Sequence, residues 1–331
     1  MLDFLRLIRF PNLIIIALTL YGVRYGLMEP IYQHAISEML LRGFLVSGLS
    51  LHMSSFDFGL LNFSIISIAA AGYIINDYFD TKIDRINKPE LVIVGRIVKR
   101  RVAMVMHISL SIIGLFIGIY LSLKVGNWKL SSIHLFSIVA LWFYSTHLKK
   151  QFLSGNLLIS LLAALVPITA ALFEFASGSI VNLQILNKYV EGMGSSLLSK
   201  GTFLVFGYAA FAFLSNLVRE IVKDIEDMEG DQADGAQTVP IVLGETQAKF
   251  ICMSIAVFIM ILLFFIEKML WNSTLTWMFW YLIAAVFLPL ISLVFMIFQA
   301  NQKKHYTIAS TLCKVLIVAG IISMFVFRFT I

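Results

Sequence analysis

The sequence has few charged residues for its length. Charged side chains make up only 13% of the 331 residues, whereas 60% are hydrophobic and the mean hydropathy is +0.90. Soluble domains are nearer half apolar and a quarter charged. The shortage of charge therefore excludes an ordinary soluble domain and predicts an integral membrane protein that crosses the bilayer several times.

Cysteine is also scarce, and the signature motifs of several soluble enzymes are missing. The two cysteines, Cys252 and Cys313, fall in apolar segments without CxxC spacing, which excludes a secreted disulfide framework and indicates packing residues. The six histidines show no metal-ligand spacing. None of GxGxxG, GxxxxGK(S/T), GxSxG or HExxH occurs. Their absence excludes the corresponding nucleotide-binding, hydrolase and zinc-protease chemistries.

Nine apolar stretches are long enough to cross a bilayer, at roughly 20 residues each. They cover residues 10–29, 56–79, 102–123, 130–147, 155–176, 201–222, 248–267, 275–298 and 308–328. Arg6 and Arg9 precede the first stretch as in a signal peptide, but no small-x-small cleavage site follows, so we expect a retained first span. Arg24 lies inside that span and should face protein, because a charge is costly in lipid.

Basic residues are unequally distributed between the two sides of the predicted membrane. With the N-terminus inside, the inner segments carry about twice as many Lys and Arg residues as the outer ones. This excess predicts a multi-pass protein of the cytoplasmic (inner) membrane with a cytoplasmic N-terminus. We expect one all-α membrane-embedded domain over residues 1–331, with four-helix halves at about 10–147 and 155–298 and a ninth helix at 308–328.

Three oxygen donors recur at four-residue spacing at the inner end of the second span. Asn76, Asp80 and Asp84, here called the first acidic segment, would lie on one face of a helix. Neighbouring carboxylates repel one another unless a cation lies between them. Mg²⁺ prefers carboxylate oxygens, with waters and substrate phosphates completing its shell. The alternative to a metal-bridged phosphate site is a solvated helix end.

A second acidic segment follows the sixth span. Glu220, Asp224, Asp227 and Asp231 are spaced to lie on one face of a continuing helix. The alternative here is a charged surface helix held by local pairs such as Lys223 with Asp227. Both acidic segments fall on the cytoplasmic side, where a helical bundle can bring them into one cavity. Ionisable residues inside a bundle are candidates for function.

Lys and Arg residues follow both acidic segments. Candidates for contact with phosphate are Arg85, Lys88, Lys149, Lys150 and Arg219. Each could instead anchor the chain at the cytoplasmic surface. One divalent ion leaves part of a diphosphate's charge uncompensated, so phosphate contact is a reasonable role for some of these cations.

Together these motifs resemble those of the UbiA-type membrane prenyltransferases. The N-x₃-D-x₃-D motif of that superfamily is matched by Asn76, Asp80 and Asp84, and its D-x₆-D-x₃-D motif by Glu220, Asp227 and Asp231, with Glu in place of the first Asp. The end of span four, Tyr144–Lys150, and the stretch GAQTVP at Gly235–Pro240 are also similar. The chain departs from the family at Glu90–Gly95, where an Arg of the common pattern is missing.

The resemblance implies nine helices around a central cavity and Mg²⁺ as cofactor. It implies metal contact by Asn76, Asp80, Asp84, Glu220, Asp227 and Asp231, of which Asp80, Asp84, Asp227 and Asp231 are the catalytic candidates. It implies substrate contact by Asn76, Arg85, Lys88, Tyr144, Lys149, Lys150 and Arg219. The metal and the lysines would stabilise a departing diphosphate in a pocket that excludes water.

Within the superfamily, NDYFDTKIDRINKP and REIVKDIEDMEGD most resemble the geranylgeranylglycerol-phosphate geranylgeranyltransferases. The resemblance implies Mg²⁺-dependent transfer of a geranylgeranyl-type group from its diphosphate to geranylgeranylglyceryl phosphate, which forms an ether lipid. The partners would be a prenyl diphosphate, a phosphorylated lipid acceptor and the membrane lipids; nothing in the sequence indicates nucleic acid or a protein partner.

Two alternatives stay open. One is prenylation of an aromatic quinone precursor of the 4-hydroxybenzoate, homogentisate or dihydroxynaphthoate type. The other is an ion or solute transporter. Transporters carry their acids near the membrane midplane at broken helices, whereas these acids lie at helix ends with lysines following.

Overall fold

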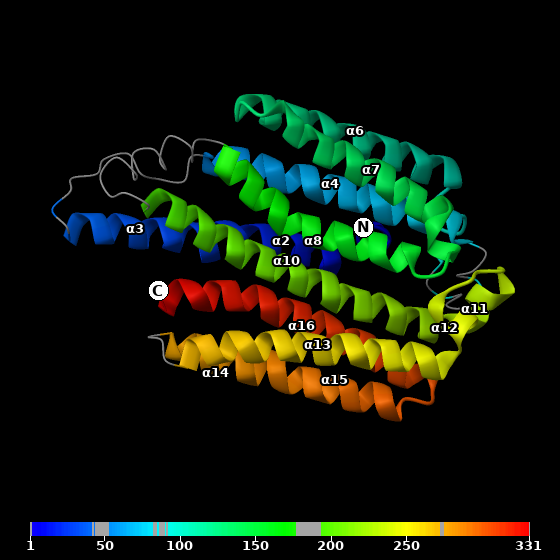
Figure 1. Cartoon of the computed structure of the whole chain (residues 1–331). Helices are drawn as coiled ribbons and strands as arrows, with labels where there is room; N and C mark the ends of the chain where they lie inside the picture. Colours follow the sequence, from blue (N-terminus) through cyan, green and yellow to red (C-terminus); the bar gives the residue numbers. More distant parts are fainter. Residues whose placement is uncertain are drawn as a thin grey trace.

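The computed structural model describes residues 2–41, 43, 53–81, 85, 90, 92–176, 193–271 and 275–330. Within these ranges the chain is helical and contains no β-strand. Figure 1 shows long helices lying alongside one another. Eight of them are long and apolar enough to cross a membrane. The prediction of an all-α, multi-pass membrane protein is therefore confirmed.

The first half of the chain contains α1 (Leu2–Leu7), α2 (Phe10–Tyr21), the π-helix η1 (Gly22–Met28), α3 (Glu29–Leu41), α4 (Ser55–Phe79), α6 (Arg100–Lys124), the 3₁₀ turn η3 (Trp128–Leu130), α7 (Ser131–Thr146), the 3₁₀ turn η4 (Leu148–Lys150) and α8 (Ser154–Glu174). The second half contains α10 (Met193–Glu226), α11 (Met228–Ala233), α12 (Val239–Leu243), α13 (Glu245–Trp271), α14 (Thr276–Leu282), the π-helix η6 (Ile283–Phe287), α15 (Leu288–Gln299) and α16 (Lys303–Thr330).

The structure differs from the sequence prediction at the fourth predicted span. The stretch at 130–147 forms α7, a helix of only 16 residues. It is too short to count among the eight, because a helix rises about 1.5 Å per residue and a bilayer core needs ~20 residues. The other eight expected spans each match one of the eight helices, and the stretch at 275–298 is built from α14, η6 and α15 without a break in helical structure.

Helix α4, which carries Asn76, is capped at its start and packed closely against a neighbouring helix. Ser54 caps the start of α4 by accepting a hydrogen bond from the backbone N–H of Asp57 at 3.0 Å. Along its length α4 packs against α6, and the Ser64 hydroxyl donates to the carbonyl of Gly114 at 2.6 Å. A Cβ at Gly114 would lie 2.6 Å from Ile68, so only glycine permits this approach. The first part of α4, from its start to about Ile68, is therefore held in place.

A buried ion pair joins the first span to α8. Arg24 donates to Glu174 at 2.5 Å, and the two side chains are 4% and 2% exposed. The guanidinium also lies over the ring of Phe58, 4.6 Å from its centroid. The expectation that Arg24 faces protein is confirmed.

Breaking this pair should destabilise the fold. Glu174→Gln is expected to cost about 3–5 kcal/mol, because it leaves the guanidinium of Arg24 buried without a counter-charge. The double variant Arg24→Leu/Glu174→Leu removes both charges and should cost less than the single one. Thermal unfolding in detergent, followed by circular dichroism, measures both. An unchanged melting temperature for Glu174→Gln would contradict the argument.

Candidate functional site

A cavity of about 260 Å³ lies among α2, α4, α7, α8, α10 and α16. Its deeper wall is mostly apolar and includes Ile65, Ile68, Leu141, Leu165 and Val166. Polar and charged side chains gather at the end where α4 and α10 finish, here called the mouth: Arg9, Asn12, Tyr73, Asn76, Tyr144, Asn216, Arg219, Glu220, Lys223 and Lys314. The cavity thus combines an apolar interior with a charged mouth.

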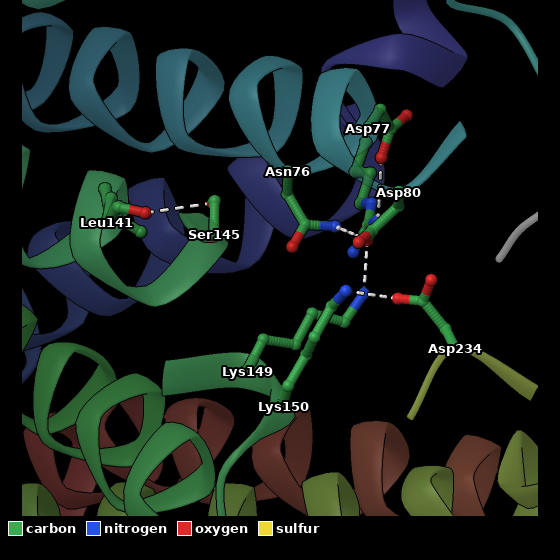
Figure 2. Close-up of polar contacts among 9 residues, drawn as sticks. Asn76, Asp77, Asp80, Leu141, Ser145, Lys149, Lys150 and Asp234 are labelled. Atoms are coloured by element: carbon green, nitrogen blue, oxygen red, sulfur yellow. Dashed lines mark hydrogen bonds and ion pairs between the residues drawn. The ribbon is translucent and has the colours of Figure 1, made fainter. Parts of the chain in front are cut away.

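Two members of the first acidic segment, Asn76 and Asp80, form a hydrogen-bonded cluster beside this mouth, drawn in Figure 2. Asn76 donates its amide N–H to Asp80 at 2.6 Å, which the four-residue spacing predicts for neighbours on a helix face. Lys149, from η4, forms an ion pair with the same carboxylate of Asp80. Asn76 and Asp80 are 7% and 5% exposed. Asp80 is thus a buried carboxylate whose charge is balanced by a lysine from a different helix.

Asp77 lies one residue off this face and has a different partner. Arg9 donates to Asp77 at 3.0 Å and lies over the ring of Tyr73, 5.1 Å from its centroid. Arg9 precedes α2 with a left-handed backbone (φ 50°). The pair fixes the start of the first span against the inner end of α4.

The second acidic segment does not lie on one continuous helix. The backbone at Asp227 (φ −99°, ψ 9°) departs from helical values, so α10 ends at Glu226 and Asp231 belongs to α11. Only Glu220 and Asp224 share the last turns of α10. The expectation that all four carboxylates lie on one continuing helix is therefore wrong.

The partners of the α10 carboxylates come from different helices. Glu220 pairs with the adjacent Arg219 and lines the cavity. Asp224 accepts a hydrogen bond from Asn156 of α8 at 2.7 Å. Because α8 and α10 pack against each other, this contact joins the two helices close to the mouth.

Asp231 brings the two acidic segments into one electrostatic environment. Its side chain is 7% exposed, and burial raises the pKa of this carboxyl to about 6. The ammonium of Lys149 opposes this rise, while the carboxylates of Asp227 and Asp80 add to it. Lys149 therefore acts on Asp80 of the first segment and on Asp231 of the second.

The short turn η4 is attached to the loop after α11. Lys150 forms an ion pair with Asp234, also drawn in Figure 2, and its carbonyl accepts a hydrogen bond from the backbone N–H of Gln237 at 2.8 Å. Tyr144, one turn before η4, lines the cavity. The Tyr144–Lys150 stretch and the Gly235–Pro240 stretch, both singled out in the sequence, are thus neighbours.

Three further candidates are Asp84, Arg85 and Lys88. Asp84 and Lys88 lie outside the described residues. Arg85 is exposed and has no ion pair within the described part of the chain. Among the residues that the structure describes, no three His, Cys, Asp or Glu side chains lie close enough together to hold a metal ion by themselves.

The sequence does not identify three residues that the structure places at or beside the site. Arg9 and Lys314 line the mouth, and Asn156 donates a hydrogen bond to Asp224 of the second acidic segment. The sequence carried a signal for the two cations, because a charge within or beside an apolar span marks a candidate site. For Asn156 there was none, since its partner is 68 residues away in the chain.

The fold and the mouth define a class of protein: a multi-pass helical membrane protein with an apolar cavity under a charged mouth. A model of the UbiA prenyltransferase family matches residues 41–324. The chain belongs to this family.

Relatives and solved structures agree with this assignment. The chain is similar to the digeranylgeranylglyceryl phosphate synthase of Methanothermobacter thermautotrophicus, at 37% identity over 191 residues. The match covers 57% of each chain, so the chain spans little more than half the length of this curated relative.

Two solved structures share the fold. One, described as digeranylgeranylglyceryl phosphate synthase in membranes, aligns with a TM-score of 0.58 at 22% identity over 98% of both chains. The other is a UbiA homologue from Archaeoglobus fulgidus bound to DMAPP and Mg²⁺, with a TM-score of 0.54 at 15% identity over 97% of this chain and 99% of that one.

Proposed function

We propose that the protein transfers a geranylgeranyl-type prenyl group from its diphosphate to geranylgeranylglyceryl phosphate, forming an ether lipid, and that the reaction depends on Mg²⁺. The observation that carries the proposal is the charged cluster of Asp80, Asp231 and Lys149, which the hydrogen bond from Asn76 to Asp80 joins to the mouth of the apolar cavity. The similarity to digeranylgeranylglyceryl phosphate synthase favours the lipid acceptor. The Archaeoglobus homologue bound to DMAPP and Mg²⁺ favours the donor and the metal.

The side chains at the mouth fit a magnesium ion. Mg²⁺ is commonly held by one or two carboxylates together with substrate phosphates, so a cage of three protein ligands is not required. Burial and the neighbouring carboxylate of Asp227 raise the pKa of Asp231, as expected where acids are crowded without enough compensating charge. The residues that would hold the ion are Asn76, Asp80, Asp84, Glu220, Asp227 and Asp231. When bound, it would offset the charge that develops on the departing diphosphate.

The chain's own residues supply the rest of the chemistry. The bond between C1 of the prenyl group and the diphosphate oxygen breaks, and a bond forms between C1 and the free glycerol hydroxyl, which releases its proton. Lys149 is placed to stabilise the leaving diphosphate. The apolar wall keeps water from the allylic cation. Tyr73 and Tyr144 line the mouth, and aromatic rings of this kind can stabilise a passing positive charge.

The acceptor is decided by a direct assay. Purified protein with Mg²⁺ and geranylgeranyl diphosphate should convert geranylgeranylglyceryl phosphate to a product heavier by one prenyl group, and chelation of the metal should abolish the reaction. Mass spectrometry of the extracted lipid measures both results. A parallel panel contains 4-hydroxybenzoate, homogentisate and dihydroxynaphthoate. Prenylation of an aromatic compound with no reaction of geranylgeranylglyceryl phosphate would replace the proposal with the quinone-type reaction. The absence of transfer to every acceptor would favour the transporter function instead.

The orientation of the site is part of the same proposal. The excess of Lys and Arg on the side of the mouth supports an inner membrane protein whose site faces the cytoplasm. The same assay in sealed vesicles tests this, because a charged donor added outside should react only in inside-out vesicles.

A further inference from the structure

Lys314 is a charged residue well inside the last helix, and it lines the cavity. It is the twelfth residue of α16, so it lies roughly 16 Å along the axis from Lys303 at 1.5 Å per residue. Helix α16 begins on the side of the mouth, and helical side chains lean towards the helix N-terminus. The ammonium of Lys314 therefore extends towards the mouth. A charge at this depth is a candidate for function.

The positive charge around Lys314 exceeds the negative charge. Its ammonium interacts electrostatically with Arg219, Lys223 and Arg9, and with one carboxylate, Glu220. Glu220 is already paired with Arg219, and Arg9 with Asp77. Within the described residues neither Lys223 nor Lys314 forms an ion pair. The wall of the mouth formed by α10 and α16 thus carries two lysines, Lys223 and Lys314, that line the cavity and form no ion pair among the described residues. Glu220, Asp224 and Asp231 act on Lys223 only as neighbouring charges.

The cations on the other wall are in the opposite situation. Lys149 is paired with Asp80 and Lys150 with Asp234. Both belong to η4, which packs against α7 and α8, whereas α16 packs against α10. Figure 1 shows α16 beside α10. Lys149 and Lys150, which the sequence predicts to hold phosphate, are therefore ion-paired with Asp80 and Asp234, whereas Lys223 and Lys314 on the α10–α16 wall form no ion pair among the described residues.

Resting on the proposed function, we propose that Lys314 and Lys223 form a second anion subsite that binds the phosphate monoester of the acceptor lipid. Both substrates of the reaction carry phosphate. The diphosphate of the donor is accounted for by the acidic segments and Lys149. A second anionic headgroup at the same mouth needs cations that are not already neutralised, and charge-assisted hydrogen bonds to phosphate are the strong ones. Anchoring this phosphate at Lys314 would draw the acceptor's glycerol into the mouth beside the donor.

The test compares Lys314→Met with Lys314→Arg and with the control Lys304→Met, which removes an exposed lysine from the same helix. Lys314→Met should raise KM for the phosphorylated acceptor about 10- to 100-fold and leave kcat and the KM for the donor nearly unchanged, because the contact is uniform binding. Lys314→Arg should restore most of the affinity, and Lys304→Met should behave as the unaltered protein. With geranylgeranylglycerol, which lacks the phosphate, the two Lys314 variants and the unaltered protein should have similar KM values.

The outcomes separate this subsite from the proposed function. A rise in KM for the donor instead of the acceptor would overturn the subsite while leaving the reaction in place. If the unaltered protein transfers no prenyl group, titration calorimetry with glycerol phosphate still tests whether the subsite binds a phosphate monoester. Saturable binding that is lost in Lys314→Met supports the subsite, and equal binding overturns it. Should Lys314→Met fail to fold, Lys223→Met gives the same two readouts.

Discussion

Asp80→Asn is expected to lower kcat for prenyl transfer by at least about 10²–10³-fold, the loss seen when one electrostatic contact to a developing charge is removed. The substitution keeps the shape of the side chain and removes its charge. Asp80 is buried, accepts a hydrogen bond from Asn76 and pairs with Lys149. Within the described residues, Asp80 is the member of the first acidic segment that forms an ion pair with a cation from another element, Lys149 of η4. A neutral amide at position 80 is expected to lower the affinity for the metal, and it removes the carboxylate with which Lys149 forms its ion pair.

The measurement is the initial rate at saturating substrates over a range of Mg²⁺ concentrations. A matched control is Glu229→Gln, which removes an exposed carboxylate from α11, two residues before Asp231. That control should retain nearly full activity. Elution of Asp80→Asn as a single folded species on size exclusion excludes misfolding as the cause. Activity of folded Asp80→Asn close to that of the unaltered protein would remove Asp80 from the metal site.

Lys149→Met should reduce kcat by about 10²–10³-fold, whereas Lys150→Met should change it only a few-fold. The two lysines are adjacent and cannot be ranked from the sequence. In the structure the side chain of Lys149 is 22% exposed and acts on both acidic segments. The side chain of Lys150 is 48% exposed and pairs with Asp234. Exposed ion pairs contribute little, so the loss of Lys150 should be tolerated.

Each lysine variant is the control for the other, since both remove one charge from the same turn. Single-turnover rates with geranylgeranyl diphosphate isolate the chemical step from product release. Equal decreases of the single-turnover rate in the two variants would show that the total positive charge of η4 matters and that the particular position of the Lys149 ammonium does not. A larger loss for Lys150→Met would reverse the ranking.

The sequence predicted the class of fold and the first acidic segment because both depend on local patterns. Apolar length identified the spans, and four-residue spacing placed Asn76 beside Asp80. The same periodicity failed for the second segment. It assumed that α10 continues past Glu226, but the backbone turns at Asp227. Helical spacing therefore predicted one continuous helix where the structure has two.

What the sequence could not predict are contacts between residues far apart in the chain. Arg9 with Asp77, Asn156 with Asp224 and Lys149 with Asp80 each join residues 68 or 69 positions apart. No periodicity within a helix encodes such a pair. The division of the chain into two four-helix halves, the single domain over residues 1–331 and the roles of the individual site residues stay predictions.

The ion pair between Arg24 and Glu174 has a consequence for how the protein is made. The two residues are 150 positions apart, so the guanidinium is synthesised long before its carboxylate. At about 5–20 residues per second, the delay is roughly 8–30 seconds. During that interval the first span carries an uncompensated charge, which disfavours its release into lipid. The arrival of α8 supplies the missing charge, so the completed pair links membrane insertion of the first helix to synthesis of the fifth predicted span.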